Sequence, residues 1–392
     1  MNKNDGCNHA VNNLCVQEFN TCITGGGLAA LFLGIKLLEK DKQPSSVCVL
    51  DPSIVSCSPS AKHSGFGPNI NYSDLARNYE RIGARRTQSS VRSKFSGFAQ
   101  LLRLIGSNPE LCQPCGTIEV LSDSEKDLLA HLEEINNLMS PLFGDDVFEV
   151  RKENVKLAQI GLKTNETLIF SKLGWQLNPG KIIIFLMKRF QELGGIYLTG
   201  CRLVLIEQTH PVESPRPQSD YLGYFDCSRV KLTVQSCCSG QRSFIKCQSV
   251  IHCARTDSRN CSVLLTEPLP ELSLRTNWYF SKYSIRARPV GSQLLFELPN
   301  KDQELDAVEA RYVVDRCQSL MPNIPIRSAL CWRSGSNDNL GSRIQGAIES
   351  IKILGKSKLY SWIISDSDMG LGGEVQVALK ALNLMLSKDP KL

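Results

Sequence analysis

A glycine-rich turn near the N-terminus constrains the fold of this chain more than any other stretch. Residues 21–24 predict a short buried strand, residues 25–27 are all glycine, and residues 28–38 predict an apolar helix. Further along the chain, residues 47–51 predict a second buried strand whose last residue is an aspartate. A strand, a glycine turn, a helix and a strand that ends on an acid are together typical of a Rossmann-like dinucleotide-binding domain.

The residue types in this turn suit an anionic ligand that carries a ribose. Glycine lets the chain turn tightly and lets a pyrophosphate approach backbone amides that are unpaired at the positive end of the helix dipole. The expected cofactor-binding residues here are Gly25, Gly26, Gly27, Leu28, Ala29, Ala30 and Asp51, with Asp51 accepting hydrogen bonds from the ribose hydroxyls. An ordinary glycine-rich turn is the alternative, and the motif alone does not choose between FAD and a nicotinamide nucleotide.

The composition is that of a globular protein and argues against a disordered, fibrous, nucleic-acid-binding or membrane-spanning protein. With 392 residues, 42% hydrophobic and 21% charged, the chain is long enough for two domains and lacks the bias of a disordered or fibrous protein. Its 45 Lys and Arg against 39 Asp and Glu form no basic run, so nucleic acid is not an expected partner. The sequence has no membrane-length apolar run and no N-terminal signal, and its 16 cysteines have no disulfide-scaffold spacing, so we expect a cytoplasmic protein.

The order of the predicted elements indicates an α/β protein. Helical periodicity is clearest at residues 73–105, 122–139 and 181–193, and strands are predicted between and after these helices. Asn178 and Pro179 mark the start of the third helix, because Asn caps a helix well and Pro suits its first position. Repeated strand, helix and strand units predict a largely parallel sheet in at least one domain.

Four short motifs outside the glycine turn form a set. They are Ser-Ala-Lys-His-Ser-Gly at 60–65, Cys-Gly-Thr-Ile at 115–118, Gly-Trp-Gln-Leu-Asn-Pro-Gly at 174–180, and Trp-Arg followed by Asp338 at 332–338. In this order, the motifs and the glycine turn resemble the D-amino acid oxidase/glycine oxidase superfamily of FAD-dependent oxidoreductases. The stretch at 174–180 is the most specific agreement.

The resemblance implies how the chain is divided. It implies a Rossmann-like FAD-binding domain that is interleaved with a mixed-sheet α+β substrate domain. Together with the composition along the chain, this predicts a disordered tail at 1–18, an FAD-binding domain at 19–72, 151–265 and 328–392, and a substrate domain at 73–150 and 266–327.

The resemblance also implies a cofactor site. The cofactor is FAD, bound non-covalently, and the further residues implied to contact it are Ser60, Lys62, His63, Ala254, Gly370 and Leu371. Arg333 is implied to hold a substrate carboxylate as a bidentate pair, with a surface arginine paired to Asp338 as the alternative.

Two tyrosines are further candidates for the substrate cavity. Tyr279 and Tyr283 stand with Arg286 and Arg288 on adjoining predicted strands of the substrate domain. Such a set can line a cavity, or it can represent sheet packing with solvated charges.

The function that the resemblance implies is an FAD-dependent oxidoreductase. It would oxidise the C–N bond of a small amino acid or secondary amine by hydride transfer to the flavin, with oxygen, a quinone or a partner subunit as the electron acceptor. This chemistry requires no metal site, and the sequence offers none. Cys112 and Cys115 have a redox spacing but no thioredoxin-like setting, so we expect structural thiols there.

Two other functions stay open. Residues 253–255 and 365–368 carry an arginine and acids where the superfamily has small residues, which favours a catalytically degenerate accessory subunit or binding protein. A tRNA-base-modifying FAD oxidase is the second alternative, and it predicts RNA binding that weakens strongly with salt.

Overall fold

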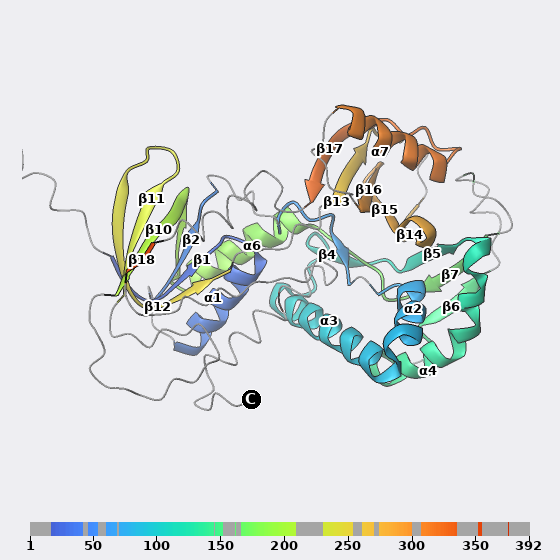
Figure 1. Cartoon of the computed structure of the whole chain (residues 1–392), viewed down its shortest axis with the longest axis horizontal. Coiled ribbons are helices and arrows are strands. Elements are labelled where there is room, and N and C mark those ends of the chain that lie inside the picture. The colour runs from blue at the N-terminus through green and yellow to red at the C-terminus, as the bar shows by residue number, and fades with distance from the viewer. Residues whose placement is uncertain are drawn as a thin grey trace, which may run out of the picture.

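The chain forms two lobes with a small sheet between them (Figure 1). The computed structural model describes residues 17–41, 46–53, 60–68, 70–144, 146–151, 161, 166–208, 230–253, 261–269, 274–299, 307–334, 352–354 and 375. Residues 17 and 18, which we expected in a disordered tail, instead begin strand β1 (Gln17–Thr24), because their backbone pairs with strand β12 (Arg242–His252) in a parallel ladder.

The first lobe is built on a seven-stranded sheet. Its strands, in spatial order, are β18 (Lys352–Leu354), β10 (Cys201–Gln208), β11 (Val230–Ser236), β12, β1, β2 (Val47–Asp51) and β9 (Ile196–Thr199). From β12 to β9 the strands are parallel, whereas β10, β11 and β12 form an antiparallel meander. Every residue of β2 is buried, as expected of a parallel strand that is covered on both faces.

Two helices cover one face of this sheet. Helix α1 (Leu28–Asp41) and helix α6 (Pro179–Glu192) pack on each other and on β1 and β2 in one apolar cluster. Asn178 caps α6, since its Oδ1 accepts a hydrogen bond from the Lys181 amide at 3.1 Å, and Pro179 is the first helical residue. The start of α6 predicted from the sequence is therefore confirmed.

The second lobe is built on an eight-stranded mixed sheet. Its strands, in spatial order, are β17 (Ser328–Ser334), β13 (Cys261–Thr266), β16 (Gln293–Pro299), β15 (Ile285–Val290), β14 (Asn277–Phe280), β5 (Thr117–Leu121), β7 (Thr167–Ser171) and β6 (Phe148–Arg151). Only β14 and β5 pair in parallel; the other pairs are antiparallel.

The strands of this sheet come from parts of the chain that we expected in different domains. β7, β13 and β17 fall within the ranges predicted for FAD binding, yet they pair in the eight-stranded sheet. Strand pairing depends on residues that are distant in sequence. A change of composition along the chain therefore does not predict which sheet a strand joins.

The helices of the second lobe lie on both sides of its sheet (Figure 1). Helix α7 (Ala307–Leu320) packs on one face. Toward the β5, β7 and β6 end, the other face is covered by α2 (Tyr72–Ile82), α3 (Ala84–Ile105), the 3₁₀ helix η1 (Asp123–His131) and α4 (Leu132–Phe143).

Two helix predictions for this lobe are corrected by the structure. The predicted helix at 73–105 is two helices, because Gly83 between them has φ +80°, outside the helical region. The helix expected at 122–139 begins as η1, and Ser122 caps it through a capping box with Glu125.

The two faces of the eight-stranded sheet differ sharply in chemistry. The face toward α7 is apolar, with Ile118, Val120, Trp278, Ala287 and Phe296 in one buried cluster. The residues at the alternate positions on the opposite face include Thr117, Glu119, Asn277, Tyr279, Arg286, Arg288 and Glu297. We call this second set the polar face; a buried polar face is unusual and indicates function.

A three-stranded sheet, β3 (Phe66–Gly67), β8 (Trp175–Leu177) and β4 (Cys112–Pro114), joins the lobes. Leu177 and Cys112 belong to the core of the first lobe, and Trp175 packs edge-on against Phe98 at 5.6 Å between ring centroids. Phe66 packs instead on Val263 and Leu295 of the second lobe. This sheet therefore fixes the end of the 60–65 loop to both lobes.

Candidate functional site

The turn between β1 and α1 has the geometry that the sequence predicts. Gly25 has φ +108°, and its amide donates to the Leu50 carbonyl at 2.8 Å. A side-chain carbon at Gly25 would collide with the Cys253 carbonyl group at the end of β12. Only glycine suits this position, which holds the turn close to β12.

The N-terminus of α1 meets the 60–65 loop. The Leu28 amide donates to the Ser60 hydroxyl at 3.1 Å, and a side-chain carbon at Gly27 would lie only 2.8 Å from that hydroxyl. Ala29 and Ala30 are buried in α1 against the sheet. The expected contact residues Gly27, Leu28 and Ser60 are therefore brought together from two separate segments.

Asp51 has protein partners at the end of β2. Its Oδ1 accepts hydrogen bonds from the amide and hydroxyl of Ser53, and its Oδ2 accepts one from the Tyr197 hydroxyl at 2.6 Å. Only 2% of Asp51 is exposed, and a side-chain carbon at Gly26 would overlap its carboxylate. Burial, together with the bond to Asp51, raises the pKa of Tyr197, so the phenol is the donor.

These residues fit the nucleotide half of FAD. The Leu28 amide at the start of α1 donates to an oxygen atom, the Ser60 hydroxyl. Amides at a helix N-terminus bind phosphate oxygens in the same way. A carboxylate offers about four lone-pair positions. Asp51 uses three of them within the chain, which leaves one for a ribose hydroxyl.

The 60–65 loop is tied to the polar face of the second lobe. The Lys62 carbonyl accepts from the Trp332 indole at 3.1 Å, and the Ser64 carbonyl accepts from Arg288 Nε at 2.8 Å. Within the loop, the Nδ1 of His63 accepts a hydrogen bond from the Gly65 amide at 3.0 Å. The loop therefore lies between the glycine turn and the polar face.

A small pocket opens on the polar face, with a volume of about 240 Å³ that includes space open to solvent. Its lining consists of Phe66, Gly67, Pro68, Asn71, Thr117, Asn277, Trp278, Tyr279 and Arg286. The residues come from the end of the 60–68 segment, the start of α2 and three neighbouring strands. No single motif contains them.

Three lining residues, Asn277, Trp278 and Arg286, each have a buried polar atom without a hydrogen-bond partner within the described residues; Trp278 belongs to the apolar cluster, and the other two lie on the polar face. Asn277 donates through Nδ2 to the Trp175 carbonyl at 3.0 Å, but its Oδ1 accepts nothing. Arg286 pairs through Nη1 with Glu297 Oε1 at 2.8 Å, while its Nε donates to nothing. Buried polar atoms normally have partners, so these two atoms are suited to receive a polar ligand.

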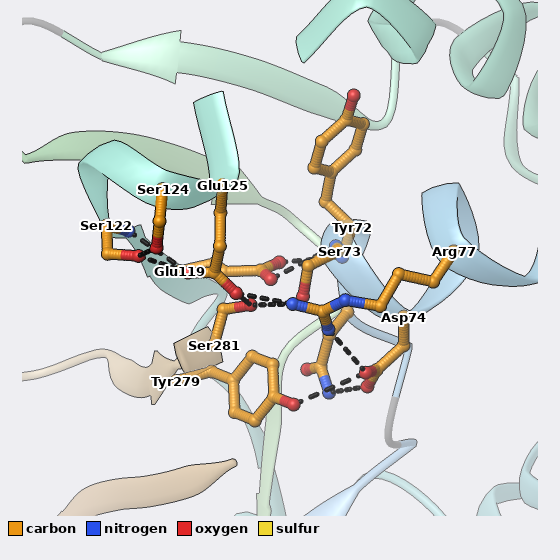
Figure 2. A network of polar contacts seen from close by, with 11 residues as sticks. Tyr72, Ser73, Asp74, Arg77, Glu119, Ser122, Ser124, Glu125, Tyr279 and Ser281 are labelled. Atoms are coloured by element: carbon orange, nitrogen blue, oxygen red, sulfur yellow. Dashed lines mark hydrogen bonds and ion pairs between the residues drawn. The ribbon is translucent and has the colours of Figure 1, made fainter. Parts of the chain in front are cut away.

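Tyr279 links the pocket to a larger polar network (Figure 2). Its hydroxyl donates to Asp74 Oδ1 at 3.3 Å, and Asp74 also accepts from Asn71 at 2.8 Å. Arg77 contacts Asp74 at 3.6 Å and pairs with Glu125, which also accepts from Ser281. The network thus runs from the pocket along α2 to the 3₁₀ helix η1.

Glu119 fixes the start of α2 to the sheet. Its two carboxyl oxygens accept from the amides of Tyr72 at 2.7 Å and Ser73 at 3.0 Å (Figure 2). Burial raises the pKa of Glu119 to about 7, against the lowering effect of these amides, and the charge of Asp74 raises it further. Neither Glu119 nor Glu297 was predicted as a site residue. The signal in the sequence is an acid inside an otherwise apolar strand.

The remaining predicted site residues are placed as follows. Tyr283 does not line the pocket; its ring packs at 4.0 Å from the Arg316 guanidinium of α7, on the opposite face of the sheet. Arg333 pairs with Ser262 in the ladder of β17 and β13, and its side chain lies outside the described structure. Ala254, Gly370 and Leu371 also lie outside the described residues.

The cysteine pair of the 112–115 segment has the chemistry of structural thiols. Burial raises the pKa of Cys112 to about 12 and that of Cys115 to about 11, so neither is a thiolate at neutral pH.

In the described part of the chain, no group of three or more His, Cys, Asp or Glu is arranged to hold a metal. None of the helices in the described ranges has the length and apolar character needed to cross a bilayer.

No protein-family model and no curated protein sequence matches this chain. Solved structures do resemble it along almost its whole length. Glycine oxidase from Geobacillus kaustophilus superposes with a TM-score of 0.61 at 12% identity, covering 94% of each chain. L-proline dehydrogenase from P. horikoshii superposes with a TM-score of 0.60 at 13% identity, covering 96% of each chain.

The third similar structure is dithionite-reduced L-alpha-glycerophosphate oxidase from Mycoplasma pneumoniae with FAD bound. It superposes with a TM-score of 0.63 at 12% identity, covering 96% of this chain and 97% of that one. The resemblance to the D-amino acid oxidase/glycine oxidase superfamily is therefore confirmed at the level of the fold: this chain has the α/β architecture of these oxidases and of the dehydrogenase, with a Rossmann-like domain and a mixed-sheet domain.

Proposed function

We propose that this chain is an FAD-dependent oxidoreductase that oxidises the C–N bond of a small amino acid or secondary amine. The observation that carries the proposal is the position of the 60–65 loop. Its first residue bonds to the N-terminus of α1, and its later residues bond to the polar face of the eight-stranded sheet. A cofactor that reaches along this loop would have its nucleotide end at the glycine turn and its reactive end near the pocket.

The chain would hold FAD without a covalent bond. The α1 amides and the glycines at 25–27 would bind the pyrophosphate, and Asp51 would accept from the ribose. FAD was bound in the glycerophosphate oxidase of the same fold, which supports the choice of a flavin over a nicotinamide nucleotide. When bound, the flavin supplies the two-electron acceptor for the oxidation.

The protein residues would orient the substrate. Asn277 Oδ1 is a buried acceptor without a partner in the described structure, and an amine N–H is a suitable donor for it. Arg286 Nε is a buried donor at the same pocket, and the buried Phe66 also lines it. Arg333 stays our candidate for the substrate carboxylate. Such positioning supplies most of the protein's contribution when a cofactor carries the chemistry.

The experiment that tests the proposal is the visible absorption spectrum of the purified protein. Oxidised flavin bands that bleach without oxygen, when D-amino acids, glycine, sarcosine or proline are added singly, would support both FAD and amine oxidation. A flavin that never bleaches with this panel would favour the accessory-protein alternative. A colourless protein that cannot be reconstituted with FAD would contradict the proposal.

A further inference from the structure

Helix α3 has an unusual balance of charge. Its 22 residues include four arginines and one lysine but no aspartate or glutamate. An exposed helix face usually mixes the two signs, because opposite charges three or four residues apart stabilise a helix and like charges there destabilise it. Arg85 and Arg86 even lie in the first turn, at the positive end of the helix dipole, where acids are favoured. Helix stability therefore does not account for these cations.

Three of the arginines lie along one line of the helix surface, and we call Arg85, Arg92 and Arg103 the arginine row. At about 3.6 residues per turn, all three lie within about 20° of the same direction, and a rise of about 1.5 Å per residue places the ends of the row about 27 Å apart. All three side chains are exposed, and so are Ser89 and Ser96 on the same side of the helix.

The arginine row faces away from the protein. The buried side chains of α3 include Val91, Phe98 and Leu101, which lie roughly opposite the row on the helix. Helix α3 itself runs along the border of the second lobe (Figure 1). Within the described ranges, no arginine of the row takes part in an ion pair or a hydrogen bond.

The neighbouring elements do not neutralise α3. Helices α2, α4 and α6, which pack on α3, together carry five Lys or Arg and five Asp or Glu, so they are neutral as a set. The 3₁₀ helix η1, one element further away, carries three acids and one lysine, which reduces the surplus of five cations without removing it. Glu133 and Glu134 of α4 are exposed, and in the described structure neither pairs with the row.

The length of the arginine row excludes a small anion as its ligand. No single carboxylate or phosphate group can contact all three guanidinium groups when the ends of the row are about 27 Å apart. Each arginine can instead bind a separate group of a long polyanion, and its fork forms two parallel hydrogen bonds with a phosphate. Serine hydroxyls, such as those of Ser89 and Ser96, are also common partners of phosphate oxygens.

The exposed face of α3 fits a nucleic acid better than a membrane or a protein. Membrane-bound helices insert large apolar side chains, and protein interfaces have an apolar core, whereas nucleic-acid interfaces are polar and positively charged. No large hydrophobic side chain of α3 is exposed. The face also lacks an exposed aromatic ring on which unpaired bases could stack, which favours a duplex over a single strand.

We propose that the exposed face of α3 binds the phosphodiester backbone of a duplex nucleic acid. We expected no such partner from the sequence, because the cations are spread from Arg85 to Arg103 without a basic run, and only the helix aligns them. RNA and DNA share this chemistry. No residue of α3 lines the pocket, so the inference is independent of the proposed function.

Two triple variants with the same net charge test the proposal. The row variant combines Arg85→Gln, Arg92→Gln and Arg103→Gln, and glutamine forms helix about as well as arginine does. The control variant removes three exposed arginines from β10, β12 and α7, by Arg202→Gln, Arg242→Gln and Arg311→Gln.

The measurement is the fluorescence anisotropy of a labelled duplex of mixed sequence, made once as RNA and once as DNA, titrated with protein at about 50 and 200 mM salt. Each phosphate contact changes the logarithm of affinity by about 0.9 per decade of salt, so three contacts predict binding about 40-fold weaker at the higher salt. In the row variant this salt slope should fall by about 2.7, and binding at low salt should weaken. The control variant should keep the slope of the wild type. The duplex that binds more tightly identifies the source of the phosphates.

Three results would overturn the proposal. They are no binding of either duplex at about 50 mM salt, equal slopes in the row and control variants, and row-dependent binding to phosphatidylserine vesicles or polyglutamate that is tighter than to both duplexes. The last result would assign the row to a membrane surface or an acidic protein. Circular dichroism checks that both variants are folded. If the row variant is not, Arg92→Gln alone replaces it and should lower the slope by about 0.9.

Discussion

The glycine turn of the first lobe and the polar face of the second lobe form the two halves of the proposed site in different ways. The residues of the turn are close in sequence: three consecutive glycines join β1 to α1, and β2 ends nearby at Asp51, although Cys253, Ser60 and Tyr197 from other segments pack against them. The polar face is assembled from β5, β14, β15 and β16, whose residues lie as far apart as Thr117 and Glu297. The nucleotide half of the proposed site can therefore be predicted from one stretch of sequence. The substrate half cannot, because its residues come together only through strand pairing.

The two halves also differ in how their charges are balanced. Asp51 is the only carboxylate described above at the turn, and its oxygens are satisfied by hydroxyl and amide donors. The polar face instead carries several ionisable groups, including the Arg286 and Glu297 pair, the buried Glu119 and the buried Arg288. Substitutions in the turn should therefore act through backbone geometry, and those on the polar face through charge.

The largest effect is expected from Glu297→Ala. It would remove the carboxylate that pairs with the buried Arg286, and breaking a buried ion pair costs about 3–5 kcal/mol of unfolding free energy. Chemical denaturation followed by fluorescence measures this. Glu110→Ala, which removes an exposed ion pair to Lys181, is the control and should leave stability unchanged. Equal stability of the two variants would contradict the charge-based account of the polar face.

A smaller loss of stability is expected from Gly25→Ala. A non-glycine residue in a strained backbone region costs about 1–3 kcal/mol, and the new side-chain carbon would also meet the Cys253 carbonyl group. Gly83→Ala is the matched control, since Gly83 also has a positive φ of +80° but has no atom within 4 Å of the added carbon. Gly25→Ala should be the less stable variant in thermal unfolding; the opposite order would refute close packing at the turn.

Asp51→Ala should weaken FAD binding by about tenfold, as expected for the loss of one hydrogen bond to a charged group. Titration of the FAD-free protein with FAD, followed by flavin fluorescence, measures this. Tyr197→Phe is the control because it removes the phenol from Asp51 and keeps the carboxylate. An equal loss of affinity in both variants would mean that Asp51 acts only by supporting the turn.

The sequence predicted the first half of the site better than the second. Gly25, Gly27, Leu28 and Asp51 lie within one strand, helix and strand unit, so their arrangement follows from local geometry. The hydrogen bond between Ser60 and Leu28 was not predicted; the family resemblance implied only that Ser60 contacts the cofactor. Asn277 and Glu297 could not be placed together from sequence, because the antiparallel register of β14, β15 and β16 decides which residues share a face.

Alternation along the strands would have supplied part of the missing signal. Glu119 and Glu297 each stand inside an apolar strand, and a charged residue in such a run indicates either an exposed face or a buried polar site. Tyr283 shows the limit of this reasoning. It follows β14 in a 3₁₀ turn, so the period of two that places Tyr279 on the polar face does not extend to it.

The last prediction concerns pH and tests whether the buried carboxyl group of Glu119 on the polar face changes stability with pH. The ordinary pKa of Glu is 4.5, and burial raises the pKa of Glu119 to about 7. Between these values the folded chain keeps a proton that the unfolded chain releases, so the contribution of Glu119 to stability is complete below pH 4.5 and is lost as pH rises toward 7, by at most about 1.4 kcal/mol per pH unit. Glu119→Gln should remove this part of the slope when unfolding free energy is measured across that range. An unchanged slope in Glu119→Gln would mean that Glu119 stays ionised, held by the amides of Tyr72 and Ser73.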